Sequence, residues 1–229
     1  HPERFSKLFG IGLTDRLQDA CDTLLGQGFT LEDSTEIHVD ISNVGDLSDD
    51  RTGHFTRITR LRGPVTNPLD GAPAEATIHM VASSPATHSS VEYIDVQVTH
   101  DPALSVEAWK DQVTAYFGAP SHLDMGGFPS WVLSGDSVES GAPADLCDPE
   151  LADYRAGWWA ALPEIDPSRD VPAHDGGSCT LLVLAEVFGS EDDPALVGRT
   201  RLTMIDYASI SANRRAENAH VRSLQYPLD

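Results

Sequence analysis

Four residues offer metal ligands in patterns that could support chemistry. His38 and Asp40 alternate along one predicted strand and His79 lies on another, so the three side chains could share one face of a sheet. The register between the strands decides whether they converge. His1 could chelate copper through its α-amine and imidazole, which would make the protein a copper oxidase. The alternatives are a solvated sheet face and a terminal histidine without a role.

The motifs of the common catalytic sites are missing from the sequence. It contains no Gly-x-Ser-x-Gly, no His-Glu-x-x-His and no phosphate-binding glycine loop. Residues 174–177 (HDGG) are the most enzyme-like run in the sequence, but two glycines just before a strand are typical of an ordinary turn. Residues 46–50 begin like a calcium loop, but the positions for its glycine and final glutamate hold Arg51 and Arg57. We therefore expect no catalytic residue and no cofactor, and favour a binding protein over an enzyme.

Three tryptophans are candidates for contact with a partner. Trp158 and Trp159 are adjacent, and neighbouring helical positions point about 100° apart, so both are difficult to bury together. Trp131 could join them in an exposed aromatic platform, since tryptophan is enriched among interface anchors. The alternative is that all three pack in the core.

The cysteines predict one disulfide, between Cys147 and Cys179. Cys147 lies in a polar loop and Cys179 opens an apolar strand, whereas Cys21 falls on the apolar face of a predicted helix. A disulfide indicates an oxidising compartment, so we expect a periplasmic or secreted protein. The alternative is a cytosolic protein with unpaired cysteines.

Charge and hydropathy exclude two classes of protein. The 229 residues include 36 acidic and 15 basic side chains, for a formal net charge of −21. A nucleic-acid-binding protein would need clustered Lys and Arg. The longest apolar run, residues 181–185, is far shorter than the roughly 18 residues of a transmembrane helix. An acidic surface attracts basic molecules, so the expected partner is another protein.

Periodicity predicts the elements that would position these residues. Ser105 is a helix cap, and Gly28 and Gly118 are helix stops. Helical spacing predicts helices over residues 15–27, 106–117, 149–161 and 209–220. Alternation and apolar runs predict strands over residues 36–41, 55–61, 76–82, 91–98, 131–133, 179–188 and 200–207.

The order of these elements predicts an α+β fold, with antiparallel strands and helices packed on one face of the sheet. The order is compatible with two similar α–β halves, residues 1–100 and 101–229. The second half would carry an acidic, tryptophan-bearing insertion at residues 134–177. One continuous domain is the alternative.

Two short motifs resemble those of a known group of proteins. The run FGIGLT at residues 9–14 leads into the first predicted helix, and YFGAP at residues 116–120 ends the second one before Trp131. In these features the chain resembles small bacterial envelope proteins of the BamE and β-lactamase-inhibitor-like group. The resemblance implies a non-catalytic, partner-binding role and transfers no binding residue. We expect an exported interaction protein, in its sharper form an acidic inhibitor or immunity protein.

Overall fold

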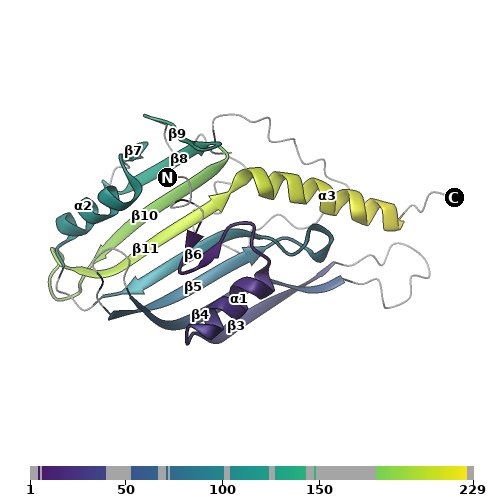
Figure 1. Cartoon of the computed structure of the whole chain (residues 1–229), viewed down its shortest axis with the longest axis horizontal. Helices are drawn as coiled ribbons and strands as arrows, with labels where there is room; N and C mark the ends of the chain where they lie inside the picture. The colour runs from purple at the N-terminus through teal and green to yellow at the C-terminus, as the bar shows by residue number, and fades with distance from the viewer. Residues whose placement is uncertain are drawn as a thin grey trace.

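The protein has an α+β fold built on one large antiparallel sheet (Figure 1). The computed structural model describes residues 5, 7–39, 53–66, 71, 73–100, 104–123, 127–142, 147 and 179–225. The helices are α1 (Leu17–Gly26), α2 (Val106–Phe117) and α3 (Tyr207–Gln225), with a 3-10 turn η3 (Pro85–Thr87). The strands are β1 (Lys7–Leu8), β2 (Ile11–Gly12), β3 (Thr30–Val39), β4 (Gly53–Thr66), β5 (Pro73–Ala82), β6 (Val91–Thr99), β7 (His122–Leu123), β8 (Pro129–Ser134), β9 (Ser137–Val138), β10 (Leu181–Gly189) and β11 (Val197–Asp206).

The strand order joins both parts of the chain. The main sheet runs β3-β4-β5-β6-β11-β10-β8-β7, with β9 paired to β8, while β1 and β2 form a separate hairpin. At the centre, β6 and β11 pair antiparallel, so residues 1–100 and 101–229 contribute to the same sheet. Each of these ranges supplies a helix followed by antiparallel strands.

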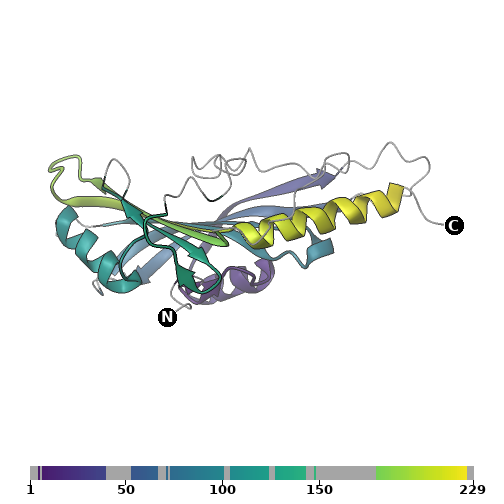
Figure 2. The same ribbon diagram turned by 90° about the horizontal axis from the view of Figure 1, so that it is seen from above.

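Two helices cover one face of the sheet, as the sequence predicts. Figure 2 shows α1 and α2 on the same side. Their buried residues recur at helical spacing and pack against the sheet; they are Leu17, Ala20 and Leu24 in α1 and Trp109, Val113 and Phe117 in α2. Ser105 caps α2, because its Oγ accepts a hydrogen bond from the Ala108 backbone N–H at 3.1 Å. Gly118 ends this helix with a φ of 93°.

The third helix differs from the first two. The first turn of α3 buries Tyr207 and Ile210 against the sheet residues Tyr93 and Leu182. Along their strands, Tyr93 and Leu182 are next to residues that pack in the α1–α2 core, and neighbouring strand residues point to opposite faces. These side chains therefore form a second, smaller core on the opposite face. No helix in the described ranges combines the length and apolar composition needed to cross a membrane.

Candidate functional site

The sheet register separates two of the proposed metal ligands. His38 in β3 pairs with His54 in β4, whereas His79 in β5 pairs with Arg60, on the other side of β4. Positions 54 and 60 are six residues apart, so His38 and His79 are offset by roughly 20 Å along the strands. The sheet register therefore does not bring these two positions together. Asp40 and His1 lie outside the described residues, and the described residues contain no group of three or more His, Cys, Asp or Glu that could hold a metal.

His79 instead belongs to a buried polar network, the sheet cluster, formed with Tyr93, Asp95 and Arg201. Asp95 is fully buried, lies opposite His79 in the β5–β6 ladder and accepts a 2.8 Å hydrogen bond from Arg201 Nε. Burial lowers the pKa of His79, an effect that the charge of Asp95 opposes. Burial also raises the pKa of Tyr93. The sheet cluster thus holds one strong ion pair and a histidine that favours its neutral form.

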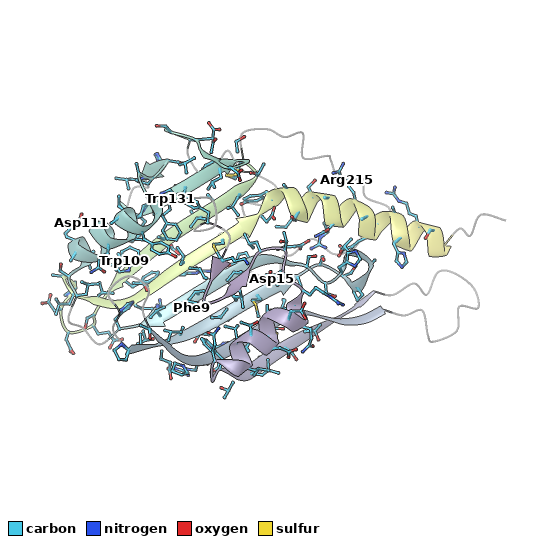
Figure 3. The ribbon with its side chains drawn as sticks, viewed as in Figure 1. Phe9, Asp15, Trp109, Asp111, Trp131 and Arg215 are labelled. Carbon is cyan, nitrogen blue, oxygen red and sulfur yellow. A yellow bond between two sulfur atoms is a disulfide. The ribbon has the colours of Figure 1, made fainter. Side chains whose placement is uncertain are left out.

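Trp131 is a core residue and not a surface anchor. Its side chain is fully buried between α2 and the sheet (Figure 3), with its ring 4.9 Å from that of Phe117. Its indole Nε1–H donates to the Gly118 carbonyl at 3.1 Å, which satisfies the polar end of the ring inside the protein. This corrects the expectation of an exposed platform at Trp131. Trp158 and Trp159 lie outside the described residues.

The cysteines are paired as predicted. Cys147 and Cys179 form a disulfide that packs in the smaller core beside Tyr207 and Ile210. Cys21 is free and half-buried on α1. Burial raises the pKa of the Cys21 thiol, while a hydrogen bond with Thr59 opposes the shift.

A groove lies between α1 and β3, with part of its floor formed by β4. We call it the α1–β3 groove; its volume is about 330 Å³, within the range of binding pockets. Leu61 forms a buried floor, and Cys21 and Thr59 lie along it. The full lining is Arg16, Leu17, Gln18, Cys21, Leu25, Leu31, Ser34, Thr56, Thr59, Leu61 and Ser89.

Two exposed leucines flank this groove. Leu25 on α1 is 46% exposed and Leu31 on β3 is 56% exposed, and both line the groove. The sequence pattern does not mark them as site residues, because Leu25 fits the apolar stripe of its helix and Leu31 precedes the predicted strand. The signal that could have found them is their position on either side of the Gly28 turn, which folds β3 back along α1.

Charged side chains of both signs surround the groove, with Arg16 in its lining and acidic residues nearby on α1 and β3. On α1, Asp22 accepts a 2.9 Å hydrogen bond from the groove residue Gln18. On β3, Glu32 pairs with Arg60 at 2.8 Å, and the neighbouring Asp33 is exposed. The groove has an apolar floor and one charged lining residue, Arg16, while the acidic Glu32 and Asp33 lie beside it on β3. A segment that is apolar within the groove and basic beside it would complement this arrangement.

A second pocket, beneath α2, is much smaller. It lies among Phe9, Trp109, Tyr116 and Leu202 and has a volume of only about 50 Å³. An apolar cavity of about 150 Å³ is needed to hold a benzene-sized ligand. This pocket is a packing gap and not a binding site of useful size.

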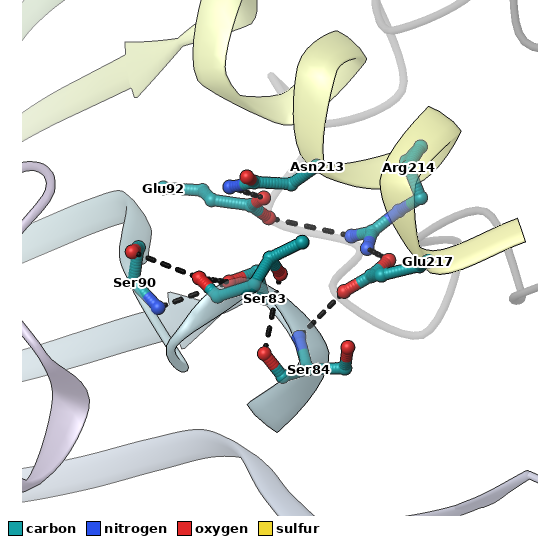
Figure 4. Close-up of polar contacts among 8 residues, drawn as sticks. Ser83, Ser84, Ser90, Glu92, Asn213, Arg214 and Glu217 are labelled. Atoms are coloured by element: carbon teal, nitrogen blue, oxygen red, sulfur yellow. Dashed lines mark hydrogen bonds and ion pairs between the residues drawn. The ribbon is translucent and has the colours of Figure 1, made fainter. Parts of the chain in front are cut away.

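A buried ionic network, the α3 cluster, fastens the third helix to the sheet (Figure 4). Arg214 lies between Glu92 on β6, at 3.3 Å, and Glu217 on α3. Glu92 also accepts a 2.9 Å hydrogen bond from Asn213 Nδ2, and Glu217 accepts one from the Ser84 backbone N–H. Every carboxylate has partners here, so the arrangement is that of a structural anchor and not of a catalytic pair.

The chain matches no protein-family model, no curated protein and no solved structure. Its function must therefore be argued from the α1–β3 groove, the sheet cluster and the α3 cluster themselves.

Proposed function

We propose that this chain is a non-catalytic, exported binding protein that captures a basic partner protein in the α1–β3 groove. The observation that carries the proposal is the pair Leu25 and Leu31, half-exposed on the two sides of one groove. Fully burying a leucine side chain stabilises by about 1.5–3 kcal/mol, so covering the exposed halves of both favours association by about 2 kcal/mol. A single exposed leucine is ordinary, but two across a groove are typical of a contact surface.

The charge of the chain supports a basic partner. The formal net charge of the chain is −21, and Asp22, Glu32 and Asp33 lie near the groove. Such a field accelerates the approach of a positively charged molecule and repels an acidic one. Charge would thus set the rate and selectivity of capture, while the leucines would supply the lasting contact.

Export is part of the same proposal. The Cys147–Cys179 disulfide is compatible with an oxidising compartment, such as a periplasm or the cell exterior. The resemblance to the BamE and β-lactamase-inhibitor-like group also favours a partner-binding role. An acidic inhibitor or immunity protein is the sharper form of the proposal.

The test uses a random peptide library displayed on phage and selected against the full chain. We expect the selected peptides to combine Lys or Arg with apolar residues. The double variant Leu25→Gln, Leu31→Thr should weaken binding by about tenfold, because about 1.4 kcal/mol corresponds to that factor. The side chains of Leu25 and Leu31 are about half exposed to solvent, so the double variant should remain folded. Circular dichroism would verify this.

Leu123→Thr on β7 is the matched control. Leu123 is 54% exposed but lies near the opposite end of the sheet, far from the groove. Its replacement should leave peptide affinity unchanged. Selected peptides that bind the double variant as tightly as the wild-type protein would overturn the assignment of the groove.

A further inference from the structure

Among the described strands, β3 is the edge of the main sheet beside the groove. It ends the strand order and, among the described strands, pairs only with β4. An edge strand carries a row of backbone N–H and C=O groups that a further strand can pair with. At the other end of the sheet, β7 spans only two residues and offers little to pair with. The ten-residue β3 is therefore the edge with the length to accept another strand.

The side chains of β3 divide between two faces of different chemistry. Leu31 and Ser34 lie opposite Leu61 and Thr59, on the face that carries the groove. A β-bulge follows Leu31, and Glu32 therefore has no partner of its own in the ladder, while Asp33 pairs with Arg60. Glu32 forms ion pairs with Arg60 and with Arg62. The groove side of the edge thus carries Leu31 and Ser34, whereas Glu32 and Asp33 lie on its other side with Arg60 and Arg62.

Asp33 brings a negative charge to this edge, opposite Arg60 in the β3–β4 ladder. It is exposed and forms no ion pair with any described residue. A basic side chain on a neighbouring strand would gain a cross-strand charge pair with it. Asp33 is consequently the residue that most directly selects for positive charge in whatever pairs with β3.

A second copy of this chain does not fit the edge. The strand contains Glu32, Asp33 and Glu36 and neither Lys nor Arg. Pairing two copies of β3 about a twofold axis would bring like charges together, which destabilises a sheet. The complementary occupant is a different chain with basic residues.

We propose that the partner binds as an extended segment of alternating apolar and basic residues, which adds a strand to β3; this rests on the proposed function. Its apolar side chains enter the α1–β3 groove beside Leu25 and Leu31, and its basic side chains face Glu32 and Asp33. Backbone pairing supplies affinity and the alternating side chains supply specificity. A partner helix in the groove would leave the backbone groups of the β3 edge unpaired. An extended partner segment would contact both the groove and this edge.

Three synthetic peptides of about nine residues test the proposal. The first alternates Leu and Lys, the second has the same composition with leucines at helical spacing, and the third alternates Leu and Glu. Fluorescence anisotropy with the full chain should give a dissociation constant for the first peptide at least about tenfold below that of the second. The third should not bind. Equal affinity for the first two peptides would overturn the strand proposal.

Single charge variants locate the basic side chains. Asp33→Asn should weaken the Leu-Lys peptide by about threefold, the size expected of one cross-strand charge pair. Asp111→Asn on the exposed surface of α2 removes the same charge elsewhere and should leave the affinity unchanged. Equal loss in both variants would show only general attraction and would contradict pairing at β3.

Amide hydrogen exchange reports the backbone pairing itself. On addition of the Leu-Lys peptide, outward-facing amides within residues 30–34 should exchange at least about tenfold more slowly. Binding that depends on Leu25 and Leu31 but leaves these amides unprotected would overturn the strand proposal and leave the proposed function standing. Peptide binding that is indifferent to Leu25 and Leu31 would overturn both.

Discussion

Arg214 on α3 and Glu92 on β6 form an ion pair in which the side chains are only 2% and 1% exposed. Glu217, which is fully buried, binds the other side of the same guanidinium. Burying charges is costly unless each is paired, and here one cation serves two carboxylates. The third helix is therefore held by a network in which both carboxylates depend on Arg214 for their opposite charge.

Replacing Arg214 should be the most destabilising change in this network. Arg214→Ala leaves Glu92 and Glu217 buried without their cation, and should lower the free energy of unfolding by about 3–5 kcal/mol. Urea denaturation would measure it. Arg215→Ala, at the exposed neighbouring position (Figure 3), should change stability by less than about 0.5 kcal/mol. A loss of similar size at both positions would contradict the anchoring role of Arg214.

Two glycines should respond in opposite ways to alanine. A Cβ at Gly63 in β4 would lie 2.6 Å from a ring atom of Phe29, so Gly63→Ala should destabilise by about 1–3 kcal/mol. A Cβ at Gly26 in α1 would meet nothing within 4 Å, and Gly26→Ala should stabilise by up to about 1 kcal/mol. Thermal denaturation of the two variants would compare them, and a neutral Gly63→Ala would argue against the close approach of Phe29.

Stability should fall as the pH drops through the titration of His79. Burial lowers the pKa of His79 below its ordinary value of 6.5, so the unfolded chain binds the proton more readily than the folded one. The stabilisation is fully present above about pH 6.5 and is lost as the pH falls towards the folded pKa. The difference between the unfolding free energies at about pH 7.5 and about pH 5 measures the effect.

His79→Gln should reduce this pH dependence, because the buried group no longer titrates. His220→Gln, on the exposed surface of α3, is the control and should retain the wild-type slope. If the slope were the same in all three proteins, the burial of His79 would not be its source.

Binding of a selected basic peptide should be slowed by salt. The association rate constant should fall by about tenfold between about 50 mM and about 500 mM salt, because screening shortens the reach of the acidic surface. The dissociation rate should change less, since it depends mainly on the buried leucines. Stopped-flow fluorescence would separate the two rates, and a salt-independent association rate would argue against electrostatic capture.

Local signals allowed some elements to be predicted closely. The bounds of α2 follow from its cap at Ser105, its apolar spacing and its stop at Gly118, all of which lie within the helix or next to it. The cores of the predicted strands were also correct. In contrast, the start of β3 was missed, because Glu32 and Asp33 are typical of loops. Its stabilising partners, Arg60 and Arg62, lie on the next strand and are not evident from local sequence.

The end of β4 was missed for a related reason. Gly63 and Pro64 look like a turn, yet the strand continues to Thr66. Pro64 is tolerated because β3 pairs with β4 only up to Arg62, so β4 has an open edge beyond that point. Gly63 is required by the approach of Phe29. Both explanations depend on neighbours that only the fold supplies.

The candidate site was the least predictable part. Periodicity identified Leu25 as an apolar helix residue but could not show that α1 lies near the sheet edge, where no further strand covers this leucine. The register that separates His38 from His79 and the burial of Trp131 are likewise properties of the assembled sheet. The disulfide was predictable because only one of the three cysteines had a clear apolar helical environment.

NMR of the isotope-labelled chain, titrated with the Leu-Lys peptide, is the sharpest test of peptide binding in the α1–β3 groove. The largest chemical-shift changes should fall on Leu25, Leu31, Thr59 and Leu61, while Leu123 should not respond. Largest changes on the sheet cluster or on α2, with Leu25 and Leu31 unaffected, would contradict binding in this groove.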